Sequence, residues 1–130
     1  FAGTGSISLE LLSRGCQQVI SVEKDRDHAR FISQCMEKLG TKDNILIKGD
    51  VFRFLKSCHQ KFDLIFADPP YDLPEQDLER LVSLVFERNL LAPDGLLIIE
   101  HSAKISMEEN PYFDHDRRYG GTAFSLFNNV

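Results

Sequence analysis

The feature that most constrains this chain is a regular alternation between short apolar segments and longer amphipathic segments. The apolar segments have the length of buried strands, and the amphipathic segments repeat their apolar residues at helical spacing. A chain with this order of elements forms a parallel sheet with helices on both faces. The expected strands are residues 19–22, 45–48, 62–67 and 96–99. The expected helices are residues 6–14, 26–39 and 78–85, together with a short helix capped by Asp50.

The C-terminal part of the chain departs from this alternation. Residues 113–119 and 122–127 have strand character, and Gly120-Gly121 between them predicts a tight antiparallel hairpin. A turn is expected at Pro93-Asp94-Gly95. We therefore expect one domain over residues 1–130, a doubly wound, Rossmann-like α/β fold with a mostly parallel sheet and a C-terminal hairpin. Ligands of such sheets bind outside the carboxyl ends of the strands.

Composition excludes several classes of protein. With 42% apolar and 27% charged residues, the chain has the balance of a soluble globular domain, and its apolar runs are too short to span a bilayer. No signal peptide is visible, and the three cysteines form no metal-binding pattern with the four histidines, so we expect a cytoplasmic protein without a metal. The net charge of −5 argues mildly against a nucleic-acid partner, although a local basic patch remains compatible with it.

Three loops at successive strand ends form a candidate cofactor site. Ala2-Gly3-Thr4-Gly5 precedes the first helix, where glycines let the backbone approach a ligand or simply form a turn. Glu23 ends the next strand and can accept hydrogen bonds from both ribose hydroxyls; the alternative is a solvated acid beside Lys24, which we include in the site. Asp50 is placed to cap a helix and also to contact an adenine amino group, with Val51 as an apolar wall.

The segment Asp68-Pro69-Pro70-Tyr71 is the candidate catalytic loop, because it ends the strand at residues 62–67. Prolines lack an N–H, so the backbone there offers acceptors in a rigid geometry. Asp68 and the carbonyl of Pro69 can accept the two hydrogens of an exocyclic amino group, and Asp68 can counter the positive charge that grows when that nitrogen attacks a methyl group. Tyr71 offers an aromatic face to an unstacked base.

Together F-A-G-T-G, V-I-S-V-E-K-D, D-L-I-F-A-D-P-P-Y, L-L-A-P-D-G-L-L-I-I-E and Y-G-G-T-A-F-S-L-F resemble the class I S-adenosylmethionine-dependent methyltransferases of base amino groups. The closer resemblance is to the bacterial RsmD family, which methylates N2 of one guanine in small-subunit (16S) ribosomal RNA. The resemblance implies S-adenosylmethionine as cofactor and ribosomal RNA, or the assembling small subunit, as partner of a monomer without membrane contact. It assigns the methionine part of the cofactor to Ala2 through Gly5, the ribose to Glu23, the adenine to Asp50 and Val51, and the base to Asp68 through Tyr71. It also implies an upstream segment that this sequence lacks.

Other readings stay open at this stage. An adenine-N6 DNA methyltransferase uses the same D-P-P-Y segment, although this chain has little room for a target-recognition domain. A non-catalytic nucleotide-binding module would retain the fold, and a dehydrogenase is disfavoured because Ser8 replaces the third fingerprint glycine. Arg117 and Arg118 are candidates for RNA phosphate contacts or solvated charges. His101 is read either as a residue that faces the substrate or, as is commoner for a lone histidine, as a surface residue, and Glu100 has no assigned role.

Overall fold

The computed structural model describes residues 1–3, 7, 18–39 and 44–129. The expected helix at residues 6–14 lies outside the described residues, apart from Ile7. The chain divides into two compact units, Phe1–Phe54 and Leu55–Val130, called here the N-terminal and the C-terminal unit. The expectation of one domain over residues 1–130 stays a prediction.

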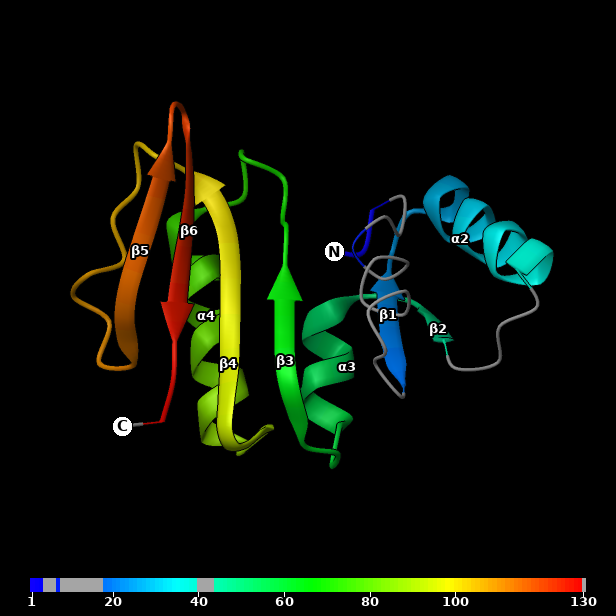
Figure 1. The fold of residues 1–130 in the computed structure, drawn as a ribbon, viewed down its shortest axis with the longest axis horizontal. Helices are drawn as coiled ribbons and strands as arrows, with labels where there is room; N and C mark the ends of the chain where they lie inside the picture. Colours follow the sequence, from blue (N-terminus) through cyan, green and yellow to red (C-terminus); the bar gives the residue numbers. More distant parts are fainter. Residues whose placement is uncertain (4–6, 8–17, 40–43, 130) are drawn as a thin grey trace. The chain divides into compact units, whose positions relative to one another are not determined.

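The N-terminal unit contains a parallel strand pair with a helix against it. Strand β1 (Val19–Glu23) pairs with β2 (Asn44–Lys48), from Val19 opposite Asn44 to Glu23 opposite Lys48. Helix α2 (Arg26–Leu39) connects them and buries Ala29 and Ile32 (Figure 1). A parallel connection of this kind brings the carboxyl ends of both strands to the same edge. The loops after Glu23 and after Lys48 are therefore neighbours.

Each of the two helices that follow these strands begins with a side-chain cap. Asp25 Oδ1 accepts hydrogen bonds of 2.9 Å from the N–H groups of Asp27 and His28, which satisfies two free donors in the first turn of α2. These bonds, led by that of His28, lower the pKa of Asp25 below its ordinary value. Asp50 caps α3 (Val51–Ser57) in the same way, as predicted, with bonds to the N–H groups of Phe52 (2.7 Å) and Arg53 (3.3 Å).

The C-terminal unit is a four-stranded mixed sheet in the order β3-β4-β6-β5. Strands β3 (Phe62–Ala67) and β4 (Leu91–Ser102) run parallel and are connected by α4 (Glu75–Glu87). Strands β5 (Phe113–Tyr119) and β6 (Thr122–Phe127) form the predicted antiparallel hairpin, and β6 pairs antiparallel with β4. Figure 1 shows α4 on one face of this sheet. The fold is thus the expected α/β architecture, with parallel pairs and antiparallel strands at the C-terminal end.

The core of the C-terminal unit lies between α4 and this sheet. Burial alternates along β4 and β6, so every second residue faces the core. The helix contributes Leu78, Leu81, Val82, Val85 and Phe86, and the strands contribute Leu97, Ile99, Ala123 and Phe127. The opposite face carries half-buried residues such as Ile98, Glu100 and Phe124. No helix in the described part of the chain is long and apolar enough to cross a membrane.

The prediction of a turn at Pro93-Asp94-Gly95 is wrong, because β4 includes these residues. The strand begins at Leu91, opposite Phe62, and its register shifts before Leu96 pairs with Leu64. Asp94 has a positive φ of 65° within this irregularity. A Cβ at Gly95 would lie 2.8 Å from the carbonyl oxygen of Ala92, so only glycine fits this close approach of backbone to backbone.

Candidate active site

Glu23 organises the carboxyl end of β1. Its side chain is buried, with 7% exposed, and both carboxylate oxygens accept hydrogen bonds from backbone N–H groups. Oε1 accepts from Gly3 at 2.5 Å and Oε2 accepts from Asp25 at 2.9 Å. Gly3 has a φ of 60°, which favours glycine, and nothing lies within 4 Å of a Cβ built there. The carboxylate retains further lone pairs, so it can still accept hydroxyl hydrogen bonds. The reading of Glu23 as a solvated acid is wrong.

The backbone connects the same three loops. The N–H of Ala2 bonds to the carbonyl of Val22 at 3.1 Å, and the N–H of Gly49 bonds to the carbonyl of Glu23 at 2.9 Å. The N-terminal segment, the end of β1 and the end of β2 are therefore held side by side. The described candidate cofactor residues of the N-terminal unit gather in one place, as the strand-end rule predicts. Thr4 and Gly5 lie outside the described residues.

Lys24 and Asp50 bring opposite charges to this place. Lys24 Nζ lies 4.0 Å from Asp50 Oδ2, and the lysine side chain is 80% exposed. An exposed pair at this distance contributes little to stability. Asp50 uses Oδ1 for the helix cap, which leaves Oδ2 facing solvent and Lys24. Val51 follows as the first residue of α3 and is half-buried. The carboxylate of Asp50 and the apolar side chain of Val51 thus lie next to each other in the chain, just after β2.

The candidate catalytic loop lies in the C-terminal unit, directly after β3. Asp68 is exposed, Pro69 is buried and Pro70 is exposed. The carbonyl of Pro70 accepts a 3.0 Å bond from the N–H of Leu73, which closes the turn. Within the part of the chain that the structure describes, no turn or loop N–H donates to the carbonyl of Pro69. The loop therefore presents the exposed carboxylate of Asp68 on a proline-stiffened backbone.

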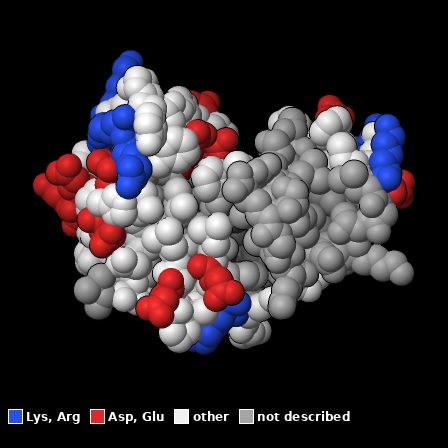
Figure 2. Space-filling view, viewed as in Figure 1, with Lys and Arg blue, Asp and Glu red and all other residues white. Residues whose placement is uncertain are grey.

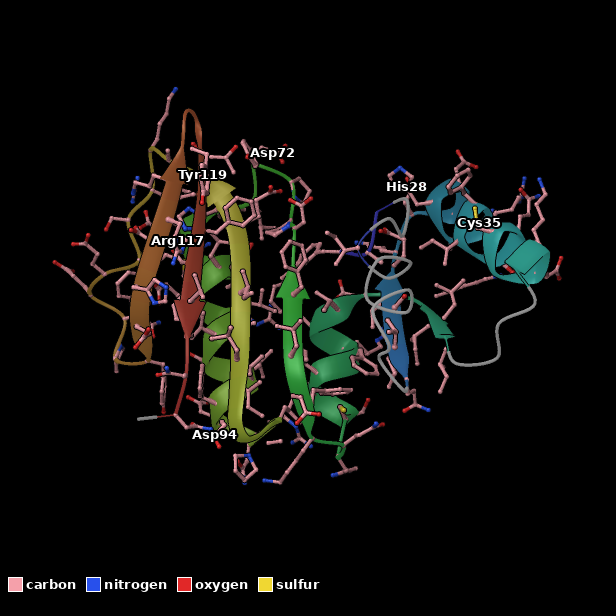
Figure 3. The ribbon with its side chains drawn as sticks, in the orientation of Figure 1. His28, Cys35, Asp72, Asp94, Arg117 and Tyr119 are labelled. Carbon is pink, nitrogen blue, oxygen red and sulfur yellow. The ribbon has the colours of Figure 1, made fainter. Side chains whose placement is uncertain are left out.

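Tyr71 is attached to the hairpin, which sequence reasoning did not foresee. Its hydroxyl lies 2.7 Å from Thr122 Oγ1, the first residue of β6, and half of the Tyr71 side chain is exposed. In the sequence, Thr122 directly follows the predicted hairpin turn at Gly120-Gly121. That position was the available signal that its side chain could contact another loop. The bond fixes one edge of the ring and leaves a face accessible. Asp72, at the end of the loop, and Tyr119, at the hairpin tip, both lie toward the carboxyl ends of β3 and β4 (Figure 3).

A second carboxyl group accompanies Asp68. Ala67 of β3 pairs with Ile99 of β4, so the following residues, Asp68 and Glu100, are neighbours on adjacent strands. Their hydrogen bond, followed by partial burial and the negative charge of Asp68, raises the pKa of Glu100 to about 7. Among the described residues, no group of three or more His, Cys, Asp or Glu side chains could hold a metal ion.

His101 is buried, so the prediction of a surface position is wrong. Only 2% of the residue is exposed, because it lies on the face of β4 that packs on the core. Nε2 lies 2.7 Å from Ser125 Oγ and Nδ1 lies 2.9 Å from the carbonyl oxygen of Ser102. Both ring nitrogens are thus engaged within the protein, and the ring lies on the opposite face of the sheet from Glu100.

The two hairpin arginines have different surroundings. Arg118 donates to the carbonyls of Ala103 (2.5 Å) and Ile105 (3.2 Å) and pairs with Asp116, so it ties the loop after β4 to the hairpin. Arg117 is exposed and lies opposite Phe124 in β6. Figure 2 shows Lys and Arg side chains over this part of the C-terminal unit, with Asp and Glu side chains directly beside them; the chain as a whole carries a net charge of −5.

Comparison with known proteins gives the family. A family model described as Conserved hypothetical protein 95 matches residues 1–128. The Ribosomal RNA small subunit methyltransferase D of Haemophilus influenzae is 32% identical over 104 residues, which cover 77% of this chain and 53% of the relative. The chain therefore spans about half the length of this curated relative.

Solved structures share the fold. A Haemophilus influenzae structure superposes with a TM-score of 0.84 at 29% identity and covers 100% of this chain and 83% of its own. The SAH-bound methyltransferase PaMTH1 of Podospora anserina superposes with a TM-score of 0.74 at 15% identity, over 99% of this chain and 70% of its own. The second likeness concerns the fold alone, and both agree with a class I methyltransferase architecture. The chain belongs to the RsmD family, which the matching family model describes as Conserved hypothetical protein 95.

Proposed function

We propose that the protein transfers a methyl group from S-adenosylmethionine to an exocyclic amino nitrogen of a nucleobase, and that this nitrogen is N2 of a guanine in small-subunit ribosomal RNA. Family membership and the name of the Haemophilus influenzae relative support the reaction and the substrate. The observation that carries the proposal is the exposed Asp68 at the carboxyl end of β3, beside the half-exposed ring of Tyr71. A carboxylate and an aromatic face are the groups that such a base requires.

The loop after β3 manages the charge of the amino nitrogen. When bound, S-adenosylmethionine would supply a methyl group on a positively charged sulfur; as the base nitrogen takes the methyl group, the carbon–sulfur bond would break and the sulfur would leave as a neutral thioether. The base nitrogen is a poor nucleophile because its lone pair is delocalised into the ring, and positive charge grows on it as the new bond forms. Asp68 accepts one N–H hydrogen bond, counters this charge and takes the proton, while the carbonyl of Pro69 accepts the second hydrogen. Pro69 and Pro70 hold both acceptors at fixed φ angles.

The strand-end loops of the N-terminal unit form the proposed cofactor site. The Glu23 carboxylate, oriented by the N–H groups of Gly3 and Asp25, accepts the ribose hydroxyls. Asp50 Oδ2 accepts the adenine amino group, Val51 packs against the adenine and Lys24 lies at the rim. The methionine part binds along the backbone of Ala2 through Gly5.

The hairpin of the C-terminal unit is the proposed RNA-facing element. Tyr119 has 63% of its surface exposed and contacts Phe124 edge-on, with ring centroids 6.1 Å apart. Arg117 lies two residues away on the same strand face, which offers a cation for phosphate beside a ring for base stacking. We infer ribosomal RNA or the assembling small subunit as partner of a monomer in the cytoplasm.

The test is methyl transfer by the full-length protein from radiolabelled S-adenosylmethionine to small-subunit ribosomal RNA, with duplex DNA in parallel. Asp68→Ala should lower kcat by roughly a hundred- to ten-thousandfold, because the transition state loses its proton acceptor. Calorimetry should find unchanged cofactor binding in this variant. Asp72→Ala, which removes an exposed carboxylate from the same loop, is the matched control and should keep wild-type activity.

Three results would contradict the proposal. Methylation of adenine in duplex DNA would favour the DNA enzyme, and binding of S-adenosylmethionine without transfer to any nucleic acid would favour a non-catalytic module. Full turnover in Asp68→Ala would remove Asp68 from its assigned role. Mapping the modified nucleotide in the labelled RNA identifies the guanine atom that receives the methyl group.

A further inference from the structure

The register of the C-terminal sheet brings two carboxyl groups together at one point. Strands β3 and β4 pair from Leu64 opposite Leu96 to Ala67 opposite Ile99. The next residues along these parallel strands are Asp68 and Glu100, so their side chains lie next to each other on one face of the sheet, where their carboxyl groups can form a hydrogen bond. Two carboxyl groups share a hydrogen bond only when one of them keeps its proton. One of these two groups is therefore a donor and the other is the acceptor.

Glu100 is the group that keeps the proton near neutral pH. The hydrogen bond with Asp68, then partial burial, then the charge of Asp68 raise the pKa of Glu100 to about 7. Asp68 is exposed, whereas Glu100 is half-buried on the sheet. Glu100 is accordingly the neutral donor of the pair and Asp68 the acceptor.

The surroundings of Glu100 contain few other charges. Phe124 of β6 lies opposite it, and Arg117 of β5 lies opposite Phe124. Arg117 is thus two strands away, about 10 Å in the hydrogen-bonding direction, where its charge is largely screened by water and salt. Ser102, the next residue on this face of β4, pairs with Thr122, and His101 points to the core. Asp68 is the dominant charged neighbour of Glu100 among these described residues.

We propose that Glu100 is a positioning residue for Asp68: with its proton in place, it donates a hydrogen bond to the Asp68 carboxylate and orients it toward the substrate amino group. This inference rests on the proposed function. Of the two Asp68 oxygens, Glu100 occupies one, and the other stays available to the base. Ionisation of Glu100 replaces the hydrogen bond by repulsion between two carboxylates. Turnover therefore falls as the pH rises through the range in which Glu100 loses its proton.

The experiment compares Glu100→Gln and Glu100→Ala in the full-length enzyme, with kcat and KM measured for ribosomal RNA between pH 5.5 and 9, a range chosen around neutrality. Glutamine keeps an N–H donor but cannot ionise, so Glu100→Gln should keep most of the kcat and lose the inflection near pH 7 that we expect for the wild type. Glu100→Ala removes the donor and should lower kcat by roughly ten- to hundredfold, with KM nearly unchanged. Glu109→Gln, at an exposed glutamate of the same unit, should retain the wild-type profile.

A second measurement does not depend on activity. Carboxyl ¹³C NMR of the protein should show Glu100 titrating near pH 7 in the wild type and at lower pH in Asp68→Ala, because the hydrogen bond and the negative charge are gone. An unchanged inflection in Glu100→Gln, wild-type kcat in Glu100→Ala, or an ordinary Glu100 titration would each overturn the inference. If Asp68→Ala abolishes transfer while the Glu100 variants do not, only the role of Glu100 fails. If the wild type transfers no methyl group to RNA, the proposed function fails as well.

Discussion

Tyr71 combines a fixed position with an accessible ring. Its hydroxyl is 2.7 Å from Thr122 Oγ1, and half of the side chain remains exposed. A free tyrosine on a loop would lose rotamer entropy when a base stacks on it, and the bond to β6 removes part of that cost in advance. The loop after β3 is therefore stiffened twice, by Pro69 and Pro70 in its backbone and by the hairpin at its aromatic end.

Removal of the Tyr71 hydroxyl separates the effect of the bond to Thr122 from the effect of the exposed ring. Tyr71→Phe keeps the stacking face but loses the bond to Thr122, so we expect KM for RNA to rise by roughly two- to thirteenfold, the equivalent of about 0.5–1.5 kcal/mol. Tyr71→Ala also removes the ring and should raise KM further, by the roughly 1–3 kcal/mol of a stacked base. Steady-state kinetics with ribosomal RNA measures both. Tyr112→Phe is the control, because the half-buried Tyr112 stacks on Phe86 and not on the loop after β3. Equal KM values for wild type and Tyr71→Ala would rule out the stacking role.

Individual residues differ in how far the sequence predicts their role. The helix cap of Asp50 was predictable because a cap depends only on the few residues that follow it. The burial of His101 was not, because it depends on Ser125, which lies 24 residues further along the chain. The same holds for Tyr71 and Thr122, which are 51 residues apart. Contacts between distant parts of the chain leave no local pattern.

Among the elements, α3 joins the end of β2 to the C-terminal unit, and its first turn depends on Asp50. Asp50→Ala should lower the free energy of unfolding by about 1 kcal/mol, because two N–H groups lose their acceptor. Asp50→Asn should be nearly neutral, since asparagine caps as well as aspartate does. Urea denaturation measures both changes.

The same pair of variants tests the cofactor role of Asp50. If Asp50→Asn folds normally but binds S-adenosylmethionine more weakly by calorimetry, the carboxylate itself contacts the ligand, since the cap is preserved. Equal affinity in the two proteins would limit Asp50 to the helix cap. Ser57→Ala, at the other end of α3, is a control that leaves the cap intact.

Long, strongly patterned elements were predicted accurately from the sequence. The bounds of α2, β3 and the β5–β6 hairpin agree with the structure, because their apolar spacing and their glycine turn are unambiguous. The beginning of β4 was missed because Pro93-Asp94-Gly95 has the composition of a turn. Pairing of Leu91 with Phe62 extends the strand across these residues, and such pairing comes from tertiary context rather than local preference.

At the scale of the whole molecule, the sign of the net charge is a poor guide to the partner. The chain carries a net charge of −5, yet Lys and Arg side chains gather over the hairpin region of the C-terminal unit (Figure 2). Binding to RNA depends on the local potential where phosphate approaches, since charges beyond about 10 Å are screened at physiological salt. Within the hairpin, Asp114 and Asp116 balance Arg117 and Arg118, so a phosphate contact there would depend on the local position of the exposed Arg117 and not on a net positive charge.

Global stability carries a second signature of the paired carboxyl groups. The pKa of Glu100 is about 7 in the folded protein and 4.5 for an ordinary glutamate. Between these values the folded state therefore holds a proton that the unfolded chain has lost, and the free energy of unfolding decreases as the pH rises. The stabilisation that comes from the Glu100 proton is fully present below pH 4.5. It is lost progressively up to about pH 7 and changes no further above that pH.

Glu100→Gln isolates this contribution because glutamine does not titrate. We expect the wild type to lose stability relative to Glu100→Gln as the pH is raised from 4.5 to about 7, and the difference between the two proteins to stay constant at higher pH. Urea denaturation at several pH values measures that difference, and the ionisable groups that do not interact with Glu100 cancel because both proteins contain them. The comparison of wild type with Glu109→Gln should show no such dependence, since Glu109 is exposed. A difference between wild type and Glu100→Gln that stays level across this range would mean that the folded state does not hold the shared proton.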